Sequence, residues 1–144
     1  MVGSDAPQWT FTSAMGYPYY ANPQDDDNGF VYFNSERCRA GSSLTFLSPS
    51  VSIKGLTNPK LTFYVFHVNI SGSNDKDILQ IQVSADDADY EDLAGGLIKL
   101  NATNDGWTLY EMPLTDYVGK EKVTIGFKGI SGYGYNLAID NITI

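Results

Sequence analysis

Alternation of apolar and polar residues at every second position is the feature that most restricts how this chain can fold. It is clearest in residues 77–84 and 123–128, whereas helical spacing is hard to find anywhere in the sequence. A period of two is that of a β-strand with one buried face. We expect both segments to send their apolar side chains into one shared core. The inward positions that the pattern predicts are Leu79, Ile81, Val83, Val123, Ile125 and Phe127.

Many short strands separated by turn residues favour an antiparallel arrangement over a parallel one. Residues 61–70 are apolar on both faces, which predicts a central strand covered on each side. Further strands are predicted at residues 9–12, 29–34, 43–47, 51–54, 107–114 and 137–144. Turn signals lie between the predicted strands, among them Gly95-Gly96 and Asn104-Asp-Gly106. The sequence therefore predicts an all-β fold: a single antiparallel β-sandwich domain over residues 1–144, a jelly roll of the concanavalin-like or galactose-binding-like kind.

Composition excludes several classes of function. The chain has 144 residues and a formal net charge of −8. Nucleic-acid binding needs clustered Lys and Arg, so no nucleic-acid partner is expected. One cysteine, Cys38, rules out an internal disulfide, and we expect it to be a small buried residue. Seven Phe, ten Tyr and two Trp supply a core without cross-links.

The N-terminal residues have neither a basic region nor an apolar region of the kind found in signal peptides. No uninterrupted apolar run approaches the length of a membrane span. No membrane insertion is therefore expected. Because the chain also stops on a strand residue, we expect it to be a piece of a longer exported protein whose targeting signal lies upstream.

Catalytic machinery is not visible in the sequence. A glycosidase needs two carboxylates facing each other across a cleft, but the acidic residues 86–92 follow a strand end, where a solvated turn is expected. A serine nucleophile needs a base, and the one histidine, His67, lies inside a predicted strand with no Gly-x-Ser-x-Gly motif elsewhere. We predict a non-enzymatic protein, with glycoside hydrolysis as a distant alternative.

Asp140 is the residue that most needs a partner. In the predicted strand 137–144 it shares a face with Ala138, Ile142 and Ile144, and a carboxylate on an apolar face is costly unless a cation or hydrogen bonds satisfy it. The alternatives are a structural calcium ion, several backbone N–H groups, or an ion pair with Lys122 or Lys128.

Three further carboxylates are candidate calcium ligands. Asp25 and Asp27 lie in the acidic run 25–29, and Asp77 lies at a strand entrance. Calcium binds six to eight oxygen atoms, which acidic loops can supply. The run is not an EF-hand, because Gln24 and Ser35 occupy positions where that motif needs acidic residues. A solvated turn is the alternative reading of the run.

Tyrosines gather in two predicted loops, residues 15–21 and 131–136. The candidate ligand-binding residues are Tyr17, Tyr19, Tyr20, Tyr133 and Tyr135. A tyrosine ring offers a flat apolar face with a hydroxyl group, which suits stacking on sugar rings and protein recognition. The alternative is that these rings cover the open ends of the sandwich.

The order of several short motifs carries a family resemblance over residues 44–144. These motifs are Leu47-Ser-Pro49, Leu61-Thr-Phe-Tyr64, residues 77–84, Trp107, Val123-Thr-Ile-Gly-Phe127 and Ala138-Ile-Asp-Asn-Ile142. In this order they resemble MAM-like jelly rolls, and more narrowly the cleaved-adhesin and choice-of-anchor modules of Bacteroidetes surface or secreted proteins. The chain lacks the paired cysteines of animal MAM domains, which favours the bacterial branch.

The resemblance implies a non-catalytic module beside proteases, glycosidases or adhesins, often with a structural calcium ion. We therefore predict an adhesin-like or carbohydrate-binding accessory module of an extracellular or cell-surface protein. Its expected partners are a glycan or a host or cell-surface protein, together with neighbouring domains of the parent chain. The alternative is a structural spacer that stabilises an adjoining catalytic domain.

Overall fold

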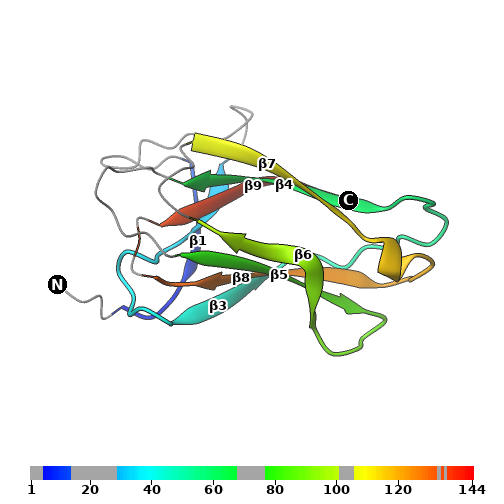
Figure 1. The fold of residues 1–144 in the computed structure, drawn as a ribbon, viewed down its shortest axis with the longest axis horizontal. Coiled ribbons are helices and arrows are strands. Elements are labelled where there is room, and N and C mark those ends of the chain that lie inside the picture. The colour runs from blue at the N-terminus through cyan, green and yellow to red at the C-terminus, as the bar shows by residue number, and fades with distance from the viewer. Residues whose placement is uncertain (1–4, 14–28, 68–76, 101–105, 133, 135) are drawn as a thin grey trace.

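The computed structural model consists of two antiparallel β-sheets packed face to face (Figure 1). It describes residues 5–13, 29–67, 77–100, 106–132, 134 and 136–144. One sheet has the strand order β1-β2-β9-β4-β7, and the other has the order β3-β8-β5-β6. The strands are β1 (Trp9–Thr12), β2 (Phe30–Phe33), β3 (Ser43–Leu47), β4 (Lys60–His67), β5 (Ile78–Ala85), β6 (Glu91–Lys99), β7 (Gly106–Pro113), β8 (Val123–Ile130) and β9 (Leu137–Thr143).

The connections between strands are those of a jelly roll. From β2 onward the chain changes sheet at every step except between β5 and β6, so that strands distant in sequence become neighbours in space. Interleaving of this kind is the double-sheet Greek-key arrangement of jelly rolls. The predicted antiparallel β-sandwich is confirmed. Among the described residues, the one helical element is a single 3₁₀ turn, η1 (Thr115–Tyr117).

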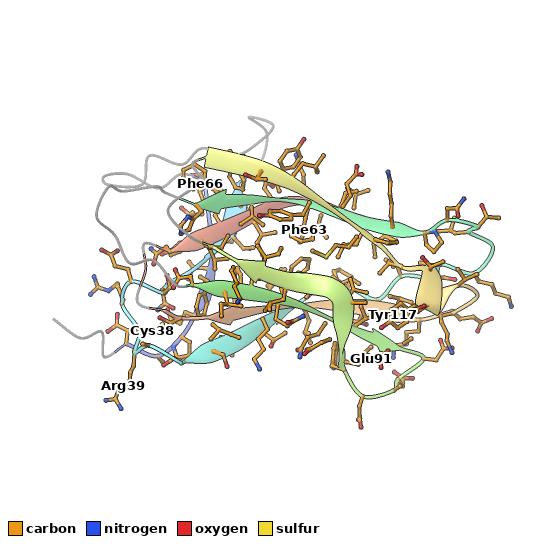
Figure 2. All side chains as sticks on the ribbon, in the orientation of Figure 1. Cys38, Arg39, Phe63, Phe66, Glu91 and Tyr117 are labelled. Carbon is orange, nitrogen blue, oxygen red and sulfur yellow. The ribbon has the colours of Figure 1, made fainter. Side chains whose placement is uncertain are left out.

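The core lies between the sheets, and the predicted inward positions of β5 and β8 are confirmed. All six of those side chains are buried in it. Phe63 of β4 reaches across to Phe127 of β8, with ring centroids 5.4 Å apart and nearly perpendicular planes. Figure 2 shows Phe63 between the two layers. Cys38 is also buried in this core, as the sequence predicts.

The strands differ from the prediction at two places. Residues 51–54 form no strand, and Val51 makes only an isolated bridge to Val123. The second error is β6, which was missed because Gly95-Gly96 resembles a turn. The two glycines instead lie within the strand, where its register with β5 shifts between Gln80 and Gln82. Gly95 has φ +76°, and a Cβ on Gly96 would lie 2.9 Å from the carbonyl oxygen of Leu93, so both positions favour glycine.

A bulge in β9 overturns the face predicted for Asp140. Asn141 has φ +52°, and the register between β4 and β9 shifts there, which adds one residue to β9. Before the bulge, Ala138 and Asp140 lie on the outer face of the sheet, whereas Ile139 packs into the core. After the bulge the alternation is reversed, so Ile142 packs against the core. The prediction that Asp140 shares a face with Ile142 and Ile144 is therefore wrong.

Within its described part, the chain forms no helix with the length and apolar character that a membrane span requires.

Candidate functional site

The outer face of the five-stranded sheet carries a group of aromatic side chains. We call this group the aromatic face; its residues are Phe30, Tyr32, Tyr64, Phe66 and Trp107. They come from three strands, and each alternates with a residue that points into the core, such as Phe33, Phe63 or Val65. Aromatic residues on both faces of these strands explain why the sequence predicts a strand covered on each side.

Strand pairing brings four of the outer positions into one row. Ala138 lies opposite Tyr32 on one side and Phe66 on the other, and Phe66 lies opposite Trp107. Neighbouring strands are about 4.8 Å apart, so three steps give the row a length of roughly 14 Å. Ala138, with its small side chain and 0% exposure, forms the floor between larger half-buried rings.

Ring contacts hold the aromatic face in a defined arrangement. Trp107 packs edge-on against Phe66, with centroids 5.3 Å apart, and against Phe30 at 5.6 Å. Phe30 is only 2% exposed, so it supports Trp107 from below. Tyr32, Phe66 and Trp107 themselves remain half-buried and present part of each ring outward. Leu109, which lies opposite Tyr64 on β7, extends the apolar surface and is 47% exposed.

Asp140 stands on the same outer face, directly opposite Tyr64. Its Oδ1 accepts the backbone N–H of Asn141 at 2.8 Å, a bond within the bulge. The Asp140 side chain is half-buried. The carboxylate therefore lies beside aromatic rings on the outer surface of the sheet and not inside the core.

Neither lysine proposed as a partner for Asp140 fits that role. Lys122 forms its ion pair with Asp87. Lys128 lies opposite Gln80 on the outer side of the four-stranded sheet, which is the other side of the sandwich. The predicted pairing with either lysine is therefore wrong.

Asp77 occupies a different environment, in which it is completely buried. Its carboxylate accepts the hydroxyl of Ser35 and the backbone N–H groups of Gly132, at 2.7 Å, and Gly134, at 3.2 Å. The Ser35 hydroxyl oxygen in turn accepts the N–H of Asn136 at 2.9 Å. Donors that point at a carboxylate satisfy its negative charge and occupy the lone pairs that a cation would use. These hydrogen bonds satisfy the buried charge of Asp77.

Calcium binding stays a prediction for the candidate carboxylates. Asp25 and Asp27 lie outside the described residues, and within the described ranges no three His, Cys, Asp or Glu side chains come together to hold a metal ion. Tyr17, Tyr19, Tyr20, Tyr133 and Tyr135, the candidate ligand-binding residues, also lie outside the described part of the chain.

Residues 86–90 after β5 form an exposed turn, as the sequence predicts, whereas Glu91 and Asp92, which were predicted to belong to that turn, begin β6. Asp86 and Asp87 both adopt positive φ angles, 51° and 64°. The Asp86 carboxylate accepts the N–H groups of Glu121 and Lys122, at 3.1 and 3.0 Å, and Asp87 pairs with the Lys122 ammonium group. Two of these carboxylates thus connect the turn to the start of β8. His67 lies at the end of β4, within the strand as predicted, and is buried.

Comparison with known proteins gives structural but no sequence relatives. No protein-family model and no curated protein matches the chain. Over 95% of its length the chain aligns with a carbohydrate-binding module of the β-sandwich superfamily, at a TM-score of 0.56 and 12% identity, and spans 52% of that chain. It also aligns over 96% of its length with an arabinose-bound α-L-arabinofuranosidase, at a TM-score of 0.56 and 11% identity.

A third alignment involves the family that the sequence resembles. The K3 cleaved adhesin domain of Lys-gingipain from Porphyromonas gingivalis aligns over 93% of this chain and 88% of that chain, at 16% identity and a TM-score of 0.48. The chain spans about half of the carbohydrate-binding structure and 22% of the arabinofuranosidase. At these identities the alignments show the fold, a β-sandwich module, and nothing finer.

Sequence reasoning missed the aromatic face. In residues 61–70 aromatic side chains occur in both alternating sets of positions, Phe63 in one and Tyr64 and Phe66 in the other, a pattern that does not distinguish a buried face from a partly exposed aromatic one. Tyr32 and Trp107 are more than seventy residues apart in the chain, and only the pairing of β2, β9, β4 and β7 brings them to one surface.

Proposed function

We propose that this chain is a non-catalytic module that binds a neutral glycan across the aromatic face, in an extracellular or cell-surface protein. The observation that carries the proposal is the row of rings from Tyr32 to Trp107, on a rigid sheet, with the Asp140 carboxylate beside it. The location is supported by the family resemblance of residues 44–144.

The chemistry of the aromatic face suits sugars. A pyranose ring presents apolar C–H groups on its faces, which pack on aromatic rings, and hydroxyl groups at its edge. Trp107 and Phe66 supply ring surface, whereas Asp140 and the phenol of Tyr64 supply a hydrogen-bond acceptor and a donor beside it. Because the rings are fixed by their contacts with one another, binding costs little side-chain entropy.

The charge of the chain favours a neutral ligand. The formal net charge is −8, so polyanionic glycans would be repelled at long range. Asp140 adds a negative charge at the site itself. We therefore expect neutral polysaccharides to bind in preference to sulfated or uronic-acid chains.

The tyrosine loops and calcium belong to the same proposal. Tyr17, Tyr19, Tyr20, Tyr133 and Tyr135 are proposed as additional ligand contacts, and calcium as a structural ion held by Asp25 and Asp27. These assignments rest on the sequence and on the family resemblance.

A glycan array followed by calorimetry tests the proposal. Trp107→Ala should weaken binding of the selected glycan by about 1–2 kcal/mol, because it removes the largest ring of the row. The control is Leu56→Ala, which removes an exposed apolar side chain outside the aromatic face and should leave the affinity unchanged. Thermal melting of both variants checks that the fold is retained.

Two results would contradict the proposal. Equal affinities of the wild type and the folded Trp107→Ala variant would place recognition away from the aromatic face. Failure of every neutral glycan on the array to bind would favour the spacer function instead.

A further inference from the structure

We propose a second saccharide-binding site, in a depression on the opposite side of the sandwich from the aromatic face. The depression has a volume of about 520 Å³ and lies where the segment after β3, the turn between β5 and β6, and the start of β8 meet. We call it the hydroxyl pocket, after the side chains that line it: Ser48, Ser50, Ser84 and Thr124, together with Tyr90.

Strand register fixes the position of the hydroxyl pocket. Ser84 and Thr124 lie opposite each other in β5 and β8, and their neighbours Val83 and Val123 point into the core. Alternation therefore turns Ser84 and Thr124 to the outer side of the four-stranded sheet. The aromatic face belongs to the outer side of the other sheet, so the two surfaces are separated by the whole core.

Hydrogen bonds hold the hydroxyl groups of the pocket in place. The hydroxyls of Ser50 and Thr124 lie 2.9 Å apart, and the Ser84 hydroxyl donates to the carbonyl oxygen of Ala88 at 2.7 Å. The Ser48 hydroxyl oxygen accepts the N–H of Ile125 at 3.0 Å. The Ser48 hydroxyl also donates to the carbonyl oxygen of Pro49 at 3.0 Å. A hydroxyl group has one donor and two acceptor sites, so each of these groups retains at least one acceptor site, and the Ser50–Thr124 pair also retains one donor.

The charges at the rim of the pocket cancel. Lys122 and Asp87 both line it and form an ion pair with each other. A charged ligand would have to compete with that pair, whereas a neutral ligand would not. Tyr90, 42% exposed, adds an aromatic side chain to the hydroxyl-lined wall. One aromatic side chain beside several hydroxyls, in a volume within the usual range of small-molecule sites, fits one or two neutral sugar rings.

A second site on the opposite side has a consequence for the whole module. A single copy would bind two glycan chains at once, or two parts of one chain, and so would cross-link its ligand. Linked binding of this kind raises overall avidity without new contacts. None of the residues that line the hydroxyl pocket belongs to the aromatic face, so binding in the pocket does not require binding at the aromatic face.

Nuclear magnetic resonance with three defined probes tests this proposal. The ¹⁵N-labelled chain is titrated separately with cellotriose, xylotriose and mannotriose, and the amide signals of Ser50, Tyr90 and Thr124 are followed. We expect them to shift and saturate with at least one probe. Tyr90→Ala should weaken that binding about 3- to 10-fold, and Tyr90→Phe should preserve it, because stacking uses the ring.

The Trp107→Ala variant separates the two sites. In that variant the shifts of the pocket amides should saturate at unchanged probe concentrations, even where binding to the aromatic face is lost. The proposal is overturned if no probe shifts the pocket amides, if Tyr90→Ala leaves their titration unchanged, or if Trp107→Ala abolishes it. Failure of the aromatic face alone would leave the pocket titration intact.

Discussion

Asp77 shows how one buried residue organises segments that are far apart in the chain. Its carboxylate accepts bonds from Ser35, Gly132 and Gly134, and it therefore links the segment after β2 to the segment before β9. Ser131 reinforces this connection by donating to the carbonyl oxygen of Ser35 at 2.9 Å. A buried charge is stable only with such partners, so the whole cluster depends on the carboxylate.

Replacement of this carboxylate by an amide should be destabilising. In Asp77→Asn the new NH₂ group would face N–H or O–H donors, and we expect the free energy of unfolding to fall by about 2–3 kcal/mol. Urea denaturation measures the change. Asp87→Asn is the matched control, since Asp87 is exposed, and it should cost at most about 0.5 kcal/mol. An equal fall in the free energy of unfolding in both variants would show that the buried hydrogen bonds of Asp77 stabilise the fold no more than the contacts of an exposed carboxylate do.

At the scale of single elements, the sequence predicts most strands but not their irregularities. Alternation is a local signal, so it identified β5 and β8 with the correct inward residues. A bulge depends on the backbone conformation of one residue and on the partner strand, and neither is visible in the pattern of apolar residues. This is why β6 was missed and why Asp140 was assigned to the wrong face.

Asn141 should be sensitive to the kind of side chain that replaces it. Its φ of +52° is tolerated by Asn and Gly but is strained for β-branched residues. We expect Asn141→Val to lower the free energy of unfolding by about 1–3 kcal/mol, and Asn141→Gly to leave it nearly unchanged. Thermal unfolding of the two variants makes the comparison. If both variants lose the same free energy of unfolding, the positive φ angle of residue 141 is not what maintains the bulge.

Tyr117 joins η1 to β6. We expect its phenol to make the stability of the protein depend on pH in the alkaline range. Its phenol donates to the Glu91 carboxylate at 2.7 Å, and the two side chains lie close together in Figure 2. Burial, followed by the hydrogen bond and charge of Glu91, raises the pKa of Tyr117 to about 12. The unfolded value is about 10, so ionisation is harder in the folded state.

The stability that Tyr117 contributes should therefore be complete below pH 10 and be lost as the pH rises through about 12. The difference in free energy of unfolding between the wild type and Tyr117→Phe should shrink by about 1–3 kcal/mol over that range. Urea denaturation of both proteins at a series of pH values measures it. A difference that stays constant between pH 9 and 12 would mean that the phenol ionises equally easily in both states.

At the scale of the whole molecule, the jelly roll presents two outer surfaces of different chemistry. The five-stranded sheet exposes aromatic rings and Asp140, whereas the four-stranded sheet exposes hydroxyl groups around Tyr90. The fold class followed from the sequence because alternation and turn residues repeat along the chain. The surfaces did not, because they depend on which strands become neighbours, and β2, β9, β4 and β7 are not consecutive.

Fluorine resonance of the two tryptophans tests the central claim most directly. The chain contains only Trp9 and Trp107. Trp9 packs against the core and donates to the carbonyl oxygen of Leu44, at 2.9 Å, so it serves as an internal control. When the 5-fluorotryptophan-labelled chain is titrated with the glycan selected on the array, the Trp107 resonance should shift and saturate while the Trp9 resonance stays in place. Saturable binding that leaves the Trp107 resonance unmoved would contradict the assignment of the aromatic face as the glycan-binding surface.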